Sequence, residues 1–306
     1  MKSLIKKNYK IFYFFAYIYD ITLQFYRKHI LTREKIIKRR YKKRLGREVR
    51  LNNPVEFNDK VQWLKLNWYD SFATTCADKY KVRDVVEKKA GSKYLNNLLA
   101  VYENVNEIDL TKLPKSFVLK GSHGSGYNIV CKDKSKMNWK KEFKKMRRWL
   151  RNNYYLRNGE WVYRDIKPRI VCEEFLFDQS QEEGLIDYKF YCFNGKPTYC
   201  QVIKERNTGG TIDFFDEEWN HMEFRGLQDL PYSKERIPRP EKFAEMLTIA
   251  AKLSEAFPFV RVDLYYVNNK IYFGELTFFP RSGFGQFYPS EWNEKIGRLI
   301  ELPNKK

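Results

Sequence analysis

The sequence lacks the features of a disulfide-stapled or zinc-binding protein. Its five cysteines are an odd number and form no Cys-x-x-Cys pair, which argues against a disulfide framework and fits a reducing compartment. Its three histidines, His29, His123 and His221, lie far apart in the sequence, so we expect no zinc site. No segment of roughly 20 to 50 residues recurs, which argues against a solenoid.

A hydrophobic run long enough to span a bilayer is also missing. The apolar run at residues 11–19 is too short, and basic residues follow it instead of a small-residue cleavage site, which argues against a secretory signal. Two interpretations of this aromatic run stay open: one side of a helix packed on the main domain, or a basic amphipathic anchor on anionic lipid. We expect a cytoplasmic protein, and the anchor interpretation adds peripheral contact with the inner face of the plasma membrane.

Positive charge is plentiful but concentrated at one end. Residues 1–50 hold 16 Lys and Arg against three acidic residues, so +13 of the net charge of +20 lies in this stretch. We therefore expect no nucleic-acid partner, although a basic membrane- or nucleic-acid-binding protein without catalysis is one alternative. With 43% hydrophobic and 17% aromatic residues, the chain has enough apolar surface for a folded core.

The periodicity predicts helices over residues 51–92 and mainly strands after residue 101. Helical patterns recur near 136–153 and 241–256. Several neighbouring strands are joined by loops too short for a parallel crossover, so the predicted fold class is α+β with mostly antiparallel sheets. The predicted strands are 116–120, 127–132, 169–176, 188–193, 198–204, 260–267 and 271–278.

A glycine-rich loop lies between two of these strands. Lys120 ends an apolar strand, Gly-Ser-His-Gly-Ser-Gly follows at 121–126, and a strand pattern resumes. This is neither a Walker A loop nor a dinucleotide fingerprint, because both of those open a helix. A flap whose backbone N–H groups cover phosphates fits better, and Lys120 beside it suits a nucleotide phosphate. An ordinary flexible hairpin is the alternative.

A charged hairpin follows near the C-terminus. Alternation places Arg261 and Asp263 on one face of the first strand, and Glu275 and Thr277 on one face of the second. Two carboxylates and a hydroxyl around one point suit magnesium, which takes few carboxylates plus phosphate oxygens. A solvated polar face is the alternative.

The register of this hairpin decides between the two interpretations. A two-residue turn at Asn268 and Asn269 would place Asp263 opposite Gly274 and turn Glu275 to the other face. A three-residue loop that includes Lys270 would pair Asp263 with Glu275, so we predict the odd-numbered loop.

Five blocks in this order resemble the ATP-grasp superfamily, and within it the TupA-like family associated with teichuronopeptide and surface-polysaccharide biosynthesis. The resemblance covers roughly residues 45–290, and residues 1–44 fall outside it. The blocks are 57–64, 76–83, 117–126, 187–197, and 261–264 with 274–277.

The resemblance implies an ATP-grasp fold, with two α+β lobes that clasp a nucleotide, after a basic helical extension. The expected boundaries are 1–44 for the extension and 45–300 for the ATP-grasp domain. Within that domain we expect a helical segment at about 45–100, a smaller flap lobe at about 101–172 and a larger lobe at about 173–300.

The resemblance also implies ATP and Mg²⁺ as cofactors and assigns roles to residues. Lys79 and Lys120 would contact ATP phosphates, under a lid made by Gly121, Gly124 and Gly126. The hinge at 172–176, with Glu173, Glu174 and Leu176, would pair with adenine, and Asp187 would lie near the ribose. Asp263 and Glu275 match the magnesium ligands, and Arg261 matches the arginine that steadies the reacting acyl phosphate.

Two positions depart from the superfamily pattern. Thr277 stands where many ATP-grasp enzymes carry an asparagine as third metal ligand. Pro280-Arg281-Ser282-Gly283 stands where others have a glycine after the proline, which leaves the substrate side of the cavity undefined.

The function expected is an ATP- and Mg-dependent ligase that joins a carboxylate to an amine through an acyl phosphate. Lys120 and Arg261 would act by electrostatic stabilisation and positioning. A glycosyltransferase of polysaccharide biosynthesis is the main alternative, although no Asp-x-Asp metal motif is present.

Overall fold

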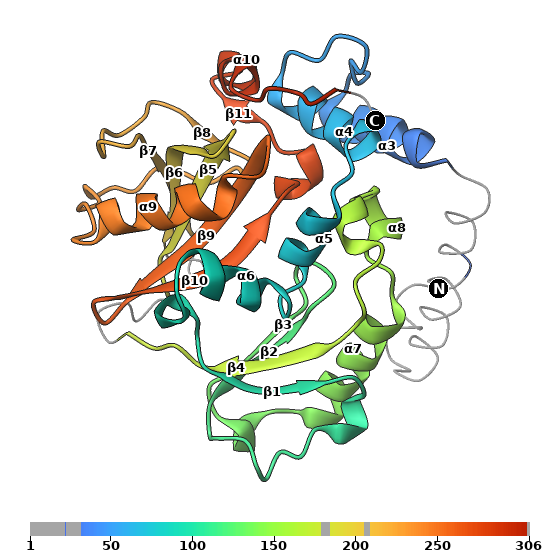
Figure 1. Cartoon of the computed structure of the whole chain (residues 1–306), viewed down its shortest axis with the longest axis vertical. Helices are drawn as coiled ribbons and strands as arrows, with labels where there is room; N and C mark the ends of the chain where they lie inside the picture. Colours follow the sequence, from blue (N-terminus) through green and yellow to red (C-terminus); the bar gives the residue numbers. More distant parts are fainter. Residues whose placement is uncertain (1–21, 23–31, 179–183, 205–208, 305–306) are drawn as a thin grey trace.

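Two antiparallel sheets dominate the computed structural model, which describes residues 22, 32–178, 184–204 and 209–304 (Figure 1). The first sheet has the order β1-β4-β2-β3 and the second has the order β10-β9-β5-β6-β7. A short pair, β8 (Arg225–Gly226) with β11 (Phe287–Tyr288), stands apart from both. The fold class is therefore α+β with antiparallel sheets, as predicted from the sequence.

The first sheet packs one face against a single helix. Its strands are β1 (Leu98–Tyr102), β2 (Phe117–Gly121), β3 (Asn128–Cys131) and β4 (Ile170–Glu174). Phe117 and Leu119 of β2 are buried with Met146 and Trp149 of α7 (Trp139–Arg151). Alternation along β2 turns Lys120 to the opposite face, away from α7.

The second sheet carries the larger core on one face. Its strands are β5 (Asp187–Phe193), β6 (Lys196–Lys204), β7 (Thr211–Phe215), β9 (Phe259–Val267) and β10 (Lys270–Thr277). The helix α9 (Phe243–Ser254) lies across this face (Figure 1). Phe190 of β5 and Phe243 of α9 stack with ring centroids 5.8 Å apart. The opposite face carries polar side chains.

The predicted loop of the β9–β10 hairpin is wrong. Only Asn268 and Asn269 form the turn, and Val267 pairs with Lys270. Both asparagines have positive φ, 49° and 61°, which the type I′ turn favoured in two-residue hairpins requires. The register then shifts between Phe273 and Glu275. This β-bulge restores the predicted pairing of Glu275 with Asp263, because one extra residue on β10 reverses the facing of every later side chain.

The helices predicted over 51–92 are confirmed as three separate ones, α4 (Phe57–Asn67), α5 (Ser71–Ala77) and α6 (Val82–Lys89). The single-turn α8 (Tyr155–Asn158) and the C-terminal α10 (Glu291–Arg298) were not predicted. Five short 3₁₀ turns complete the described part of the chain: Ser92–Tyr94, Val105–Glu107, Lys134–Lys136, Trp161–Tyr163 and Pro280–Gly283.

The helix α3 (Arg33–Leu45) crosses the expected boundary at residue 44 and packs on the domain. Ile36, Ile37 and Tyr41 are buried, and the Tyr41 hydroxyl donates to Asp59 of α4 at 2.5 Å. The aromatic run at 11–19 lies outside the described residues. Across the described ranges, no helix combines the length and the hydrophobicity needed to cross a membrane.

Candidate active site

A cavity of about 570 Å³ lies between the two sheets. The first sheet contributes Lys120 and Asn128, and the polar face of the second sheet contributes most of the opposite wall. Along β5, β9 and β10 the cavity-facing side chains recur at every second residue, as a pleated strand requires. These side chains are Asp187 and Lys189, then Arg261, Asp263 and Tyr265, then Glu275 and Thr277.

Asp263 pairs with two cations of this wall. Arg261 binds it through two nitrogens, with Nε donating to Oδ1 at 2.6 Å and Nη2 donating to Oδ2 at 2.7 Å. Lys189, directly opposite on β5, donates to the same Oδ2. Asp263 and Lys189 are both buried, so the paired charges hold each other in place inside the protein.

Glu275 faces Asp263 across the hairpin and meets a different set of cations. Lys79 Nζ lies 3.3 Å from its Oε2, and Arg261 Nη2 lies 3.8 Å from its Oε1. Burial by itself would raise the pKa of Glu275, but Lys79, Lys189 and Arg261 outweigh burial and lower this pKa to about 2. Glu275 is therefore ionised at neutral pH, the state in which a carboxylate binds a metal.

Lys79 connects the carboxylate wall to the glycine-rich loop. Its Nζ donates to the Gly124 carbonyl at 2.9 Å. Other residues of the 76–83 block have structural roles. Buried Asp78 accepts from the Tyr80 N–H at 2.9 Å, and Arg83 Nη1 lies 3.4 Å from Glu173.

The glycine-rich loop is fixed at its start and opens toward the cavity at its end. A Cβ on Gly121 would lie 2.9 Å from Tyr127, and one on Gly124 would lie 2.7 Å from Tyr154, so both glycines permit close packing. Gly126 has a φ of 75° and lines the cavity with Ser125.

At the hinge, Lys120 Nζ donates to buried Glu173 at 2.6 Å. Glu174 is exposed, and its backbone already has partners: its N–H donates to Asn97 at 3.0 Å, and its carbonyl accepts from Asn96 at 2.8 Å. Leu176 is half-buried. Adenine pairing at this hinge stays a prediction.

The structure thus brings together most of the residues predicted for the site. Those that line the cavity are Lys79, Lys120, Gly126, Asp187, Arg261, Asp263, Glu275 and Thr277. Those that do not line it are Gly121, Gly124, Glu173, Glu174 and Leu176.

Sequence reasoning missed Lys189 and the polar side chains of α4. Lys189 occupies the same strand face as Asp187, so alternation within the 187–197 block could have revealed it. Asn58 and Gln62 are buried and donate to the Gly283 carbonyl at 3.1 Å and 2.9 Å. They lie in the first block of the resemblance, but nothing local in the sequence indicates a partner more than 200 residues away.

The donor set fits a magnesium ion. No group of three or more His, Cys, Asp or Glu side chains suited to a metal occurs among the residues described. Magnesium needs fewer protein ligands than that, because water and nucleotide phosphate oxygens complete its shell. Asp263 and Glu275 are paired on adjacent strands, and the Thr277 hydroxyl lies 3.2 Å from Glu275 Oε1, so three oxygen-bearing groups face one point.

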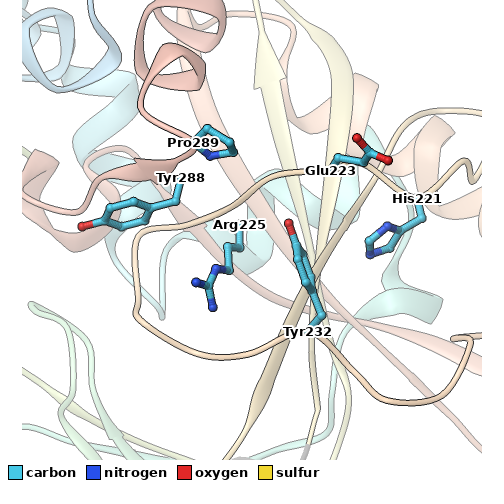
Figure 2. A pocket seen from close by; sticks show the side chains of 6 residues that line it. All are labelled: His221, Glu223, Arg225, Tyr232, Tyr288 and Pro289. Carbon is cyan, nitrogen blue, oxygen red and sulfur yellow. The ribbon is translucent and has the colours of Figure 1, made fainter.

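A second pocket, more open to solvent, lies beside the β8–β11 pair (Figure 2). In Figure 2 the Arg225 side chain lies between those of Tyr232 and Tyr288, with His221 on the far side of Tyr232. His221 is held by the buried carboxylate of Asp213, 2.9 Å away. None of the predicted site residues lines this pocket.

Comparisons with known proteins identify the family of the chain. A family model described as TupA-like ATPgrasp matches residues 59–301, whereas no curated protein matches the chain.

Among solved structures, the chain is similar to the D-alanine–D-alanine ligase of Bacillus anthracis complexed with ATP (16% identity, 68% of this chain and 55% of that chain, TM-score 0.39). It is also similar to the L-amino acid ligase of Bacillus licheniformis (14%, 79% and 54%, TM-score 0.42). The chain thus spans little more than half the length of these two proteins. Because the family model covers most of the chain and the described architecture agrees with it, the chain belongs to the TupA-like ATP-grasp family.

Proposed function

We propose that the protein uses ATP and Mg²⁺ to join a carboxylate to an amine through an acyl phosphate, in building a bacterial surface polysaccharide or a teichuronopeptide-like polymer. The observation that carries the proposal is the pairing of Asp263 with Glu275 inside a cavity that also presents Lys79, Lys120 and Arg261. Family membership supports the nucleotide-dependent chemistry. The polymer is supported by the family resemblance alone.

The cavity suits a highly charged nucleotide. Eight basic side chains and four carboxylates line it, so its formal charge is positive before any ligand binds. Lys79 donates to the glycine-rich loop at Gly124, and Lys120 directly precedes this loop. Both ammonium groups reach the cavity and form ion pairs there, Lys79 with Glu275 and Lys120 with Glu173. When ATP enters, its phosphate oxygens offer these lysines a stronger anionic partner.

Magnesium would be held by Asp263 and Glu275, with the Thr277 hydroxyl beside them. When bound, the ion would neutralise part of the phosphate charge. Arg261 is fixed by its two bonds to Asp263, and Asp263 raises the pKa of this arginine against the lowering effect of burial. Arg261 thus lies beside both carboxylates, where its guanidinium can stabilise charge on the transferring phosphoryl group.

The proposed reaction has two steps. A carboxylate oxygen of the acid attacks the γ-phosphorus, the bond from that phosphorus to the β,γ-bridging oxygen breaks, and ADP leaves. The amine nitrogen then attacks the acyl carbon, the C–O bond to phosphate breaks, inorganic phosphate leaves and the amine proton passes to water. Positioning and electrostatics meet the needs of both steps, so no side-chain nucleophile is required.

An ADP-release screen of uronic acids against amino acids, with mass spectrometry of the products, tests this proposal. The expected result is ADP formation that needs both an acid and an amine, with a product whose mass equals the two substrates less one water. Consumption of a sugar nucleotide without ATP would instead establish a glycosyltransferase.

A matched pair of variants links the activity to the cavity. Glu275→Gln removes one carboxylate charge from the cavity, whereas Glu255→Gln removes one from an exposed ion pair with Lys89. ADP release should fall at least tenfold in the first variant and stay unchanged in the second, because exposed pairs contribute about 1 kcal/mol or less. Equal rates of ADP release by the two variants would show that the reaction does not depend on this cavity.

A further inference from the structure

Four arginines from three separate elements line one end of the cavity. Arg40 and Arg44 lie one helical turn apart on α3, Arg157 lies on α8, and Arg281 follows β10. Arg44, Arg157 and Arg281 are exposed at the mouth. None of these four residues belongs to the set that sequence reasoning assigned to ATP or magnesium.

Three of these arginines have no acidic partner among the described residues. Within the described residues, no carboxylate forms an ion pair with Arg44, Arg157 or Arg281, and Arg40 donates to the amide oxygen of Asn158 at 2.5 Å. One carboxylate, that of Glu160, lines this end of the cavity. It is buried and accepts from the Ser282 hydroxyl at 2.6 Å.

Glu160 does not neutralise the arginines. Burial raises the pKa of Glu160, and the positive charges of Lys65 and Arg157 oppose this rise. Glu160 is buried and is a single carboxylate, whereas three of the arginines are exposed. This end of the cavity, the arginine end, therefore keeps an excess of positive charge, which an anionic ligand would offset.

The loop that carries Arg281 is held in a conformation that costs energy. Arg281 and Ser282 have φ values of 49° and 57°, in the left-handed region that non-glycine residues avoid. Buried donors of α4 hold the carbonyls on the other side of this loop: Gln62 Nε2 donates to Gly283 at 2.9 Å, and Lys65 Nζ donates to Ser282 at 2.6 Å. Strain that is maintained by dedicated contacts is typical of ligand-binding segments.

The order of residues along the β9–β10 hairpin shows where the arginine end lies relative to the proposed nucleotide. The cavity-lining sequence along β10 and beyond is Gly274, Glu275, Thr277, Phe279 and Arg281. Asp187, the proposed ribose neighbour, pairs with Tyr265, which lies toward the opposite end of this series. The arginine end thus lies beyond the carboxylate pair, where the acid substrate would meet the terminal phosphate.

We propose that Arg44, Arg157 and Arg281 bind a second anionic group of the acid substrate, a phosphate or a carboxylate additional to the carboxylate that reacts. The inference rests on the proposed function for the location of the nucleotide. Guanidinium groups offer paired N–H donors that match the oxygens of either anion. Substrates with a single carboxylate would leave this end of the cavity without a partner.

Anion binding to the nucleotide-loaded protein tests the proposal. The protein is first saturated with Mg²⁺ and the non-hydrolysable ATP analogue AMP-PNP, and inorganic pyrophosphate or malonate is then titrated by calorimetry. One anion per chain should bind, and the stronger of the two identifies the anion type. Arg157→Gln and Arg281→Gln should each weaken binding by roughly tenfold, the loss expected for a charge-assisted hydrogen bond. Added salt should also weaken it.

Arg39→Gln is the matched control, because Arg39 is exposed on the same helix as Arg40 and Arg44 but does not line the cavity. AMP-PNP affinity and thermal unfolding should be unchanged in all three variants. Absence of anion binding to the loaded wild-type protein would overturn the proposal, and so would equal weakening by Arg39→Gln. If AMP-PNP does not bind, the proposed function fails, and the same titration without nucleotide still tests whether Arg157 and Arg281 bind the anion.

Discussion

Replacing Gly274 by alanine should disturb the bulge that brings the two carboxylates together. A Cβ at this position would lie 2.9 Å from the Asp263 carbonyl oxygen and 3.0 Å from Tyr265 Cε2. The first contact is with backbone, which cannot move without moving Asp263 itself. Overpacking of this kind costs about 1–3 kcal/mol, so Gly274→Ala should lower the free energy of unfolding by that amount.

The same displacement should weaken the binding of Mg·AMP-PNP by at least tenfold, because it changes the separation of Asp263 and Glu275. Gly195→Ala serves as the control. Gly195 lies in the β5–β6 turn with a φ of 82°, and its Cβ would lie 3.1 Å from Glu255 Cα, so this variant should be destabilised by about 1–2 kcal/mol. Its nucleotide affinity should nevertheless be normal.

Urea unfolding and calorimetric titration together decide the outcome. If both glycine variants lose similar stability and both keep wild-type affinity for Mg·AMP-PNP, the bulge has only a structural role, and the reasoning about the metal site is refuted.

Three further predictions concern the phosphate site, the pH dependence of stability and the N-terminal segment. Lys120→Ala should weaken ATP binding with the fold intact, since Arg83 still contacts Glu173; unchanged affinity in calorimetry would remove Lys120 from the site. The folded-state pKa of Glu275 is about 2, below its usual value of 4.5, so its ionised form stabilises the fold above pH 4.5 and this stabilisation is lost as the pH falls toward 2. The stability advantage of the wild type over Glu275→Gln should shrink in that window, and a constant difference in urea unfolding would contradict the shift. Deleting residues 1–31, which leaves α3 in place, should release the protein from anionic vesicles without loss of ATP binding; insoluble protein would instead favour packing of the aromatic run.

The carboxylate pair shows what the sequence specifies and what it does not. Alternation correctly placed Arg261 with Asp263 and Glu275 with Thr277, because strand periodicity is local. The predicted three-residue loop of the β9–β10 hairpin was wrong. Two asparagines with positive φ form a complete turn, and a bulge several residues later restores the register. The glycine at 274 is the sequence signal for that bulge, since glycine inside a strand pattern often marks one.

Residues that act across long separations were not predictable by periodicity. In the sequence, Asn58 and Gln62 are polar positions of an ordinary helix. In the structure they donate hydrogen bonds to the 282–285 loop, which lies more than 200 residues away in the sequence. The arginine end combines α3, α8 and the segment after β10, and no local pattern relates these three. The family resemblance indicated that block 57–64 matters, whereas only the fold shows why.

The central claim is that Asp263 and Glu275 form a magnesium–nucleotide site, and calorimetric titration of AMP-PNP with and without Mg²⁺ tests it most directly. The account predicts tight binding to the wild type that weakens at least tenfold without Mg²⁺. It also predicts that Asp263→Asn and Glu275→Gln lose most of this Mg²⁺ dependence. Binding that is equally strong with and without Mg²⁺, or variants that respond to Mg²⁺ as the wild type does, would contradict it.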